Sequence, residues 1–203
     1  MMGFDRLKRK WLRFMHEETA TVSVEFVMMA PLMAWAFVTT LQFFDAYRAE
    51  LISTKAAVTI ADMYSREDGL INAEYLNGTR DLLKFLTLAE ASPDYRVTVF
   101  FWRETQKDYR IAWGKNRGSR LNMSNTQLNE KAGRLPKLSD GERAILIETW
   151  TDYTPKYGNR VALFLPGTSL EPLEFSTFIV TSPRFAPSLC WNNTPDDPSG
   201  LRC

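Results

Sequence analysis

The sequence predicts an α+β protein in which a long N-terminal apolar helix continues into a domain with helices packed on an antiparallel sheet. Two observations lead to this prediction. Phe26–Phe44 carries no formal charge over nineteen residues, and helical spacing continues after it. Later segments are instead rich in aromatic and β-branched residues and are separated by turns. Early helices and late strands favour helices on one face of an antiparallel sheet.

Composition excludes several classes of function. The 203 residues include 25 Lys+Arg and 24 Asp+Glu, so the formal net charge is only +1. No broad basic surface is expected, and we predict no nucleic-acid partner. Two cysteines and one histidine are too few for a structural zinc site, and we expect no metal or other cofactor.

The apolar run is long enough to cross a membrane. Nineteen helical residues span about 28 Å, close to the roughly 30 Å of a hydrocarbon core. A buried helix of a soluble domain is the weaker alternative, because the run is long and hydrophobic on every face. A removable secretory signal is the stronger rival, but its apolar part is shorter and ends near small residues. Here the run ends in Leu41–Asp45, and we therefore predict a retained anchor at residues 21–44.

The flanks of this segment predict its orientation. Residues 1–20 contain three acidic residues and five basic ones, namely Arg6, Lys8, Arg9, Lys10 and Arg13. A basic flank beside a membrane span stays on the cytoplasmic side. Residues 1–20 are thus predicted to be a cytoplasmic leader, and residues 45–203, with 20 charges of each sign, an α+β domain outside the cytoplasm.

Helices are expected first in this domain. Alanines and isoleucines at three- and four-residue steps extend the first helix through residues 45–67, and Gly69 ends it. Leucines and aromatic residues predict a second helix over Ala73–Ala91, although Gly78 lies inside it. A short helix is expected at Asn125–Gly133.

Strands follow the helices. The enrichment in aromatic and β-branched residues predicts them at Tyr95–Arg103, Asp108–Trp113, Glu142–Tyr153 and Leu173–Thr181. The first two form a hairpin. Gly114–Arg120 has a composition typical of a solvated loop.

Cys190 and Cys203 lie near the C-terminus. Outside the cytoplasm a disulfide between them is chemically reasonable, and closing this loop contributes about 3 kcal/mol in the chain-entropy model. An intermolecular bridge and two free thiols are the alternatives. The acidic pair nearby lacks the alternating spacing of a calcium loop.

No enzyme is predicted. The single histidine, His16, precedes the apolar run and falls on the cytoplasmic side, so it forms no Ser/His/Asp or Cys/His site with the exported residues. Neither a GxxxxGK[ST] nor a GxGxxG phosphate loop occurs.

Glu25 is unusual in the anchor, because it is a charged residue at the start of the apolar segment. A carboxylate carried into lipid costs about 2.5 kcal/mol or more at mid-membrane and less near the interface, and it calls for a partner or a proton. A hydrated position at headgroup depth is the simpler alternative. Trp35, at mid-segment, packs against a partner helix or faces lipid.

Around Glu25 the sequence resembles the TadE-like pseudopilins of tight-adherence (Tad) pilus systems. The shared pattern is a basic tail, a small residue, four residues, Glu25–Phe26 and a long apolar helix with an early proline, Pro31. The resemblance covers residues 14–66, and Ile147–Pro155 and Ser182–Arg184 add weaker similarity. The family has glycine before its cleavage point, where this chain has Ala20.

The resemblance implies a pilin-like fold and a set of roles. A prepilin peptidase would cut between Ala20 and Thr21, which makes Glu25 the fifth residue of the mature chain. Glu25 would pair with the Thr21 amine of a neighbouring subunit, while Phe26 and Pro31 shape the packing helix. Pro31 frees the carbonyl of Val27.

The resemblance also implies location and partners. The protein would be a minor pilin or pseudopilin of Tad (type IVb-like) pilus assembly and adhesion, with a periplasmic domain, anchored once in the bacterial inner membrane or incorporated in an extracellular pilus. Its partners would be other Tad pilins and pseudopilins, the prepilin peptidase, the inner-membrane assembly platform and the lipid bilayer. The alternative is a signal-anchored periplasmic ligand-binding or sensor protein, in which the helix is only a tether.

Overall fold

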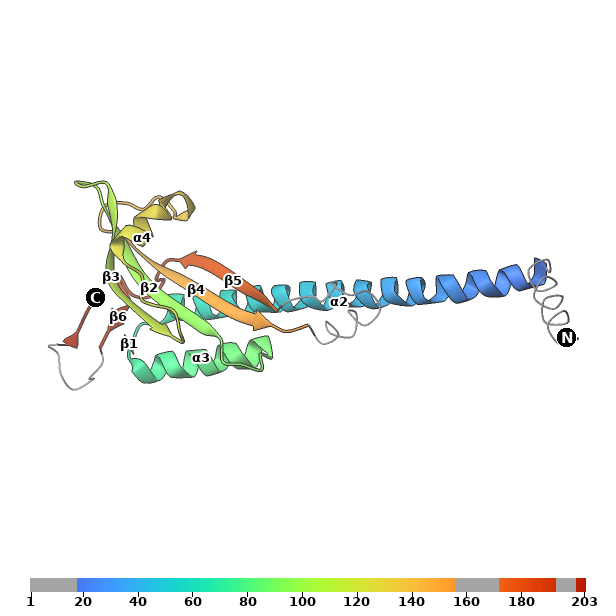
Figure 1. The fold of residues 1–203 in the computed structure, drawn as a ribbon. Coiled ribbons are helices and arrows are strands. Elements are labelled where there is room, and N and C mark those ends of the chain that lie inside the picture. The colour runs from blue at the N-terminus through green and yellow to red at the C-terminus, as the bar shows by residue number, and fades with distance from the viewer. Residues whose placement is uncertain (1–17, 156–171, 193–199) are drawn as a thin grey trace, which may run out of the picture. The chain divides into compact units, whose positions relative to one another are not determined.

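A computed structural model describes residues 18–155, 172–192 and 200–203 of the chain (Figure 1). Two compact units divide it: residues 1–45 with 155–170, and residues 46–154 with 171–203. The second unit contains all of the described strands, and we call it the body. Most of the predicted leader, residues 1–17, and His16 within it lie outside the described residues.

The first described element is helix α2, Glu18–Arg66, which is 49 residues long and contains Pro31. This confirms the predicted long apolar helix that continues beyond Phe44, to within one residue of its expected end. Within the body, Ala56, Ile60 and Tyr64 lie on one side of α2 and are buried. Their four-residue spacing is that of an amphipathic helix facing a core.

Helix α3, Ala73–Thr87, runs back along the body part of α2. Asn72 caps its start by accepting a hydrogen bond from the Tyr75 backbone N–H at 2.8 Å. Tyr64 of α2 contacts Tyr75 edge to face and lies 3.4 Å from the Thr79 hydroxyl. The prediction that this helix reaches Ala91 was wrong, because Leu88 adopts a left-handed conformation (φ 52°, ψ 31°) and ends it.

Four antiparallel strands form the main sheet in the order β3-β2-β4-β5. The strands are β2 (Asp94–Arg103), β3 (Asp108–Arg117), β4 (Arg143–Tyr153) and β5 (Leu173–Thr181). The predicted strands therefore exist, and the expected hairpin joins β2 to β3.

Strand β3 is longer than expected, so the prediction of a loop from Gly114 was wrong. Gly114–Arg117 pairs with β2, with Gly114 opposite Thr98 and Arg117 opposite Tyr95. The register shifts between Val99 and Phe100, which leaves Ala112 as a β-bulge in β3. Pairing with a long, buried neighbouring strand outweighs the low strand propensity of this segment.

Side chains cover both faces of the sheet. On one face, α2 and α3 pack over Val97, Val99, Ile145 and Ile147. On the other, Phe100 and Leu146 are covered by α4 (Asn125–Glu130), a 3₁₀ turn (Ala132–Arg134) and their flanks, listed as Met123, Leu128 and Leu135. The short helix expected at Asn125–Gly133 is thus divided into α4 and the 3₁₀ turn. The two long helices occupy one face as predicted, but the second face is not left to solvent.

Candidate functional site

Residues 22–29 near the start of α2 are exposed all round, and further large apolar side chains are exposed along the rest of the apolar run. A helix needs only one apolar stripe to pack on a core, and a helix that is apolar all round suits a membrane. Among the described residues, α2 is the one helix long and apolar enough to cross a bilayer. Its exposed apolar residues are Val22, Val24, Phe26, Val27, Met28, Met29, Leu32, Met33, Phe37, Leu41, Phe43 and Phe44.

Glu25 lies exposed within this apolar surface. Met29 and Leu32 follow it at four- and seven-residue steps, so its own side of the helix offers only apolar neighbours in the C-terminal direction. Within residues 18–155, 172–192 and 200–203 it makes neither a hydrogen bond nor an ion pair. The structure thus presents an accessible carboxylate that can accept a cation from another molecule.

The predicted cleavage point, Ala20–Thr21, falls within the helical backbone of α2. A peptidase acts on a locally opened backbone, so cleavage here requires the first turns of α2 to unwind. Helix ends open most readily. Phe26 is exposed, and α2 continues through Pro31 without interruption. These residues share one helix, but the structure brings no second group to Glu25 from the described residues.

Gln42 is a residue that sequence reasoning missed. It is only 2% exposed, and neither its amide oxygen nor its amide nitrogen has a hydrogen-bond partner in the part of the chain that the structure describes. Trp35, seven residues earlier on the same side of α2, is half-buried, and its indole nitrogen also has no partner among the described residues. A buried polar group without a partner costs about 1–3 kcal/mol. The available signal was that Gln42 is the only amide in the apolar run.

Cys190 and Cys203 form the predicted disulfide. Strand β6, Cys190–Trp191, pairs in parallel with β1, Leu70–Ile71, and Trp191 also exchanges two backbone hydrogen bonds with Arg202. The Trp113 indole N–H donates to the Leu189 carbonyl at 2.7 Å beside this pair. The bridge therefore fixes the C-terminus to a strand whose Trp191 lies in the core.

Removing the disulfide should destabilise the body without unfolding it at room temperature. The Cys190→Ser/Cys203→Ser double variant is expected to lose about 3 kcal/mol, because the unfolded chain regains the freedom of the 14-residue loop. Urea unfolding of the full chain in detergent micelles, followed by tryptophan fluorescence, measures this loss. An unchanged midpoint would show that strand pairing alone holds the C-terminus.

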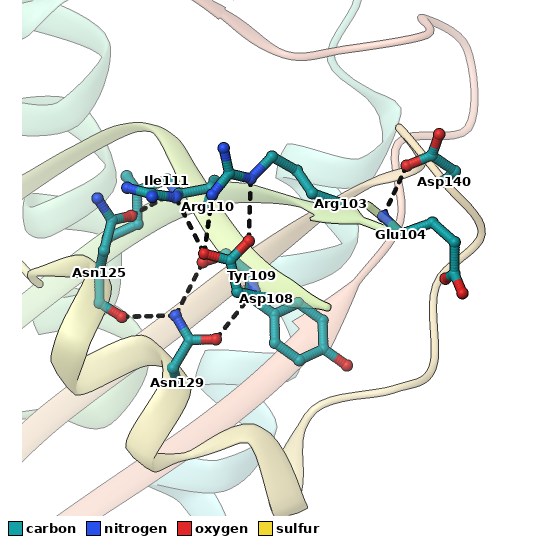
Figure 2. Close-up of polar contacts among 9 residues, drawn as sticks. All are labelled: Arg103, Glu104, Asp108, Tyr109, Arg110, Ile111, Asn125, Asn129 and Asp140. Atoms are coloured by element: carbon teal, nitrogen blue, oxygen red, sulfur yellow. Dashed lines mark hydrogen bonds and ion pairs between the residues drawn. The ribbon is translucent and has the colours of Figure 1, made fainter. Parts of the chain in front are cut away.

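Polar side chains close the outer edge of β3 near the hairpin (Figure 2). The Asn129 amide accepts from the Tyr109 N–H and donates to the Tyr109 carbonyl, both at 2.9 Å. Asn125 accepts from the Ile111 N–H at 2.9 Å. Asparagine side chains thereby satisfy backbone groups that a further strand would otherwise pair, which protects this edge from association.

Asp108 lies beside this edge between two arginines. Arg103 donates two hydrogen bonds to it, at 2.9 and 2.8 Å, and Arg110 donates one at 3.1 Å (Figure 2). The Arg103 hydrogen bonds, reinforced by both guanidinium charges, hold the pKa of Asp108 below its usual range. The carboxylate is ionised at neutral pH and fully engaged, so this cluster is suited to holding the hairpin and not to proton transfer.

The buried charges of the body form a structural network. Glu148 on β4 is 3% exposed and accepts from Arg96 Nε at 2.8 Å and from Lys131 Nζ at 2.7 Å. Arg96 also donates to the Leu121 carbonyl at 2.7 Å. In the sequence, Glu148 stands out only as part of the weak similarity at Ile147–Pro155. The network ties β2, β4 and the segment after α4 together.

The tyrosine hydroxyls of the core stay neutral. Burial raises the pKa of Tyr95 to about 12 and raises those of Tyr64 and Tyr75. The Tyr95 hydroxyl donates to the Leu76 carbonyl at 2.6 Å. Within the described ranges, no group of three or more His, Cys, Asp or Glu side chains could hold a metal ion.

Comparison of the chain with protein-family models, with curated proteins and with solved structures gives no match.

Proposed function

We propose that this chain is a TadE-like minor pilin or pseudopilin of a Tad pilus. It is a single-pass protein of the bacterial inner membrane with a cytoplasmic N-terminus and a periplasmic body, and it acts in pilus assembly and adhesion. The observation that supports this most is that Glu25 is exposed, with no partner among the described residues, near the start of a long apolar helix.

Packing between membrane helices is the proposed activity. Hydrocarbon tails are as apolar as leucine, so apolar side chains alone give helices little reason to associate in a defined register. A carboxylate on one helix and a cationic amine on the neighbouring helix define that register. Each charge is costly to bury alone, so the helices are most stable where the two groups meet. Glu25 of one subunit and the Thr21 amine of the next supply such a pair after cleavage.

The body has the complementary role in this proposal. Its sheet, disulfide and buried ion network make a fixed unit on the C-terminal part of α2. Contacts with other pilins and with the assembly platform are assigned to its surface. The proposal assigns the chain no catalytic step and no cofactor.

Mass spectrometry of the protein purified from its native membrane tests the processing step. We expect a mature chain that begins at Thr21, because cleavage there creates the amine that pairs with Glu25. An Ala20→Gly variant, which restores the residue typical of the family at this point, provides the matched control and is expected to be cleaved at least as completely.

A chain that retains Met1 in the native membrane would favour the second candidate, a signal-anchored periplasmic ligand-binding or sensor protein. The observation in its favour is Ala20 in place of glycine before the cut. If Ala20→Gly alone is cleaved, the natural chain has the topology of a pilin but is kept as a tether.

A further inference from the structure

The part of α2 that belongs to the body has one side in the core and one side exposed. Ala56 and Ile60 are buried on the core side. The opposite side carries four exposed residues, which we call the outer seam: Tyr47 (60% exposed), Leu51 (43%), Thr54 and Val58 (51%). All four lie within the body, so the outer seam is a surface of that unit alone.

The outer seam has the spacing of a coiled coil. Its residues follow one another at steps of four, three and four positions, and such steps keep side chains on one line when two helices wind around each other. In the sequence the same steps continue back through Phe44, Thr40 and Phe37. A repeat sustained over about three heptads is typical of paired helices and not of single exposed apolar residues.

The charges beside the outer seam identify the partner as a second copy of this chain. Leu51 and Val58 occupy position a of the heptad, which places Glu50 at position g and Lys55 at position e. Both charged side chains are exposed, and neither forms an ion pair within the described residues.

These two charges also define the direction of pairing. In a parallel pair, position g of one helix lies beside position e of the other, five residues later. Glu50 of each copy then meets Lys55 of the other copy, twice across the dimer. An antiparallel pair would place Glu50 beside Glu50 and Lys55 beside Lys55, which is repulsive.

We propose that two copies of the chain associate in parallel and in register through the outer seam. The seam ends at Val58, because Ala61, the next position of the repeat, is buried in the core. A contact of this length is weak between free molecules. The inference therefore rests on the membrane anchoring in the proposed function, since two chains in one membrane share a direction and a high local concentration.

The dimer goes beyond the packing proposed for the pilus. Contact between Glu25 and the Thr21 amine of a neighbour needs two helices that are staggered along their length, whereas the outer seam joins them in register. We assign the dimer to the protein in the membrane before assembly.

Thiol cross-linking of the full chain tests the proposal. Both native cysteines are used in the disulfide, so an introduced cysteine is the only free thiol. Leu51→Cys and Val58→Cys place it near the two ends of the outer seam. Thr59→Cys is the matched control, because Thr59 is exposed and adjacent to Val58 but points about 100° away around the helix.

Each variant is reconstituted at low protein content into vesicles of phosphatidylethanolamine and phosphatidylglycerol and treated with a short bismaleimide. The covalent dimer is measured on a denaturing gel. We expect strong cross-linking at positions 51 and 58 and only the background of random collisions at 59. Cross-linking at both 51 and 58 requires a parallel pair in register, since an antiparallel pair brings only its midpoint together.

Charge reversal tests the partner. In the Val58→Cys protein, Glu50→Lys and Lys55→Glu each place like charges across the dimer, and each should lower cross-linking about fivefold. The combined Glu50→Lys/Lys55→Glu variant restores opposite charges and should recover it. Reversal is the informative change, because removing one charge of a solvated pair has little effect.

The failures are distinguishable. Protein that does not float with the vesicles in a density gradient would overturn the proposed anchoring. Floating protein that is cross-linked equally at 51, 58 and 59, or at 51 without 58, would overturn only the parallel dimer. Recovery that fails in the combined variant would overturn the pairing of Glu50 with Lys55 and with it the register.

Discussion

Replacing Glu25 by glutamine should leave the protein in the membrane and remove most pili from the cell. Glutamine keeps the size of the side chain but not its charge, so the Thr21 amine of the neighbouring subunit is buried without a counter-ion. Breaking a buried pair costs about 3–5 kcal/mol, which is over a hundredfold in an association constant. Pilus number per cell, counted by electron microscopy, measures the loss, and Glu25→Ala should behave in the same way.

Glu50→Gln is the matched control for this experiment. Glu50 is an exposed carboxylate on the same helix but lies beyond the apolar run, where water solvates it. Its replacement should leave piliation unchanged, and membrane fractionation should recover both variants with the membrane. Normal piliation of Glu25→Gln would remove the carboxylate from the assembly mechanism, whereas an equal loss in Glu50→Gln would indicate a general defect of α2.

The long helix and the four main strands were predictable because their signals are local. Nineteen uncharged residues followed by helical spacing define α2 without knowledge of any other segment. The strand ends agree to within one residue for β2, β4 and β5, since aromatic and β-branched runs between turns are readable from sequence. Cys190 and Cys203 were predictable as a pair because the chain has no other cysteines.

Features decided by distant partners were not predictable. Gly114–Arg117 has the composition of a loop and becomes a strand only because β2 pairs with it. Leu88 gives no sequence signal of a left-handed helix end, which normally falls on glycine. The burial of Gln42 and the pairing of Arg96 with Glu148, 52 residues apart, likewise depend on tertiary structure.

The candidate site was predictable in part for the same reason. Glu25, Phe26 and Pro31 stand out in sequence, because a charge and a proline are unusual in an apolar run. The partner proposed for Glu25 belongs to another subunit, so neither one sequence nor the structure of one chain contains it.

Glu148→Gln should produce the largest loss of stability in the body. The variant leaves Arg96, whose side chain is 10% exposed, and Lys131 beside a neutral amide. Two cations then lie close together with no counter-charge, and removing one partner of a buried ion pair costs about 3–5 kcal/mol. Urea unfolding of the full chain in detergent micelles, monitored by tryptophan fluorescence, should show a clearly lower midpoint.

The comparison with Glu174→Gln decides whether burial is the cause. Glu174 also pairs with an arginine, Arg120, but both side chains are more than 40% exposed, and a solvated pair contributes only about 0–1 kcal/mol. The same substitution on the neighbouring strand should therefore hardly move the midpoint. Equal effects of the two substitutions would mean that solvent screens the Arg96–Glu148–Lys131 network, and that packing of Met123, Leu128 and Leu135 alone holds the second face of the sheet.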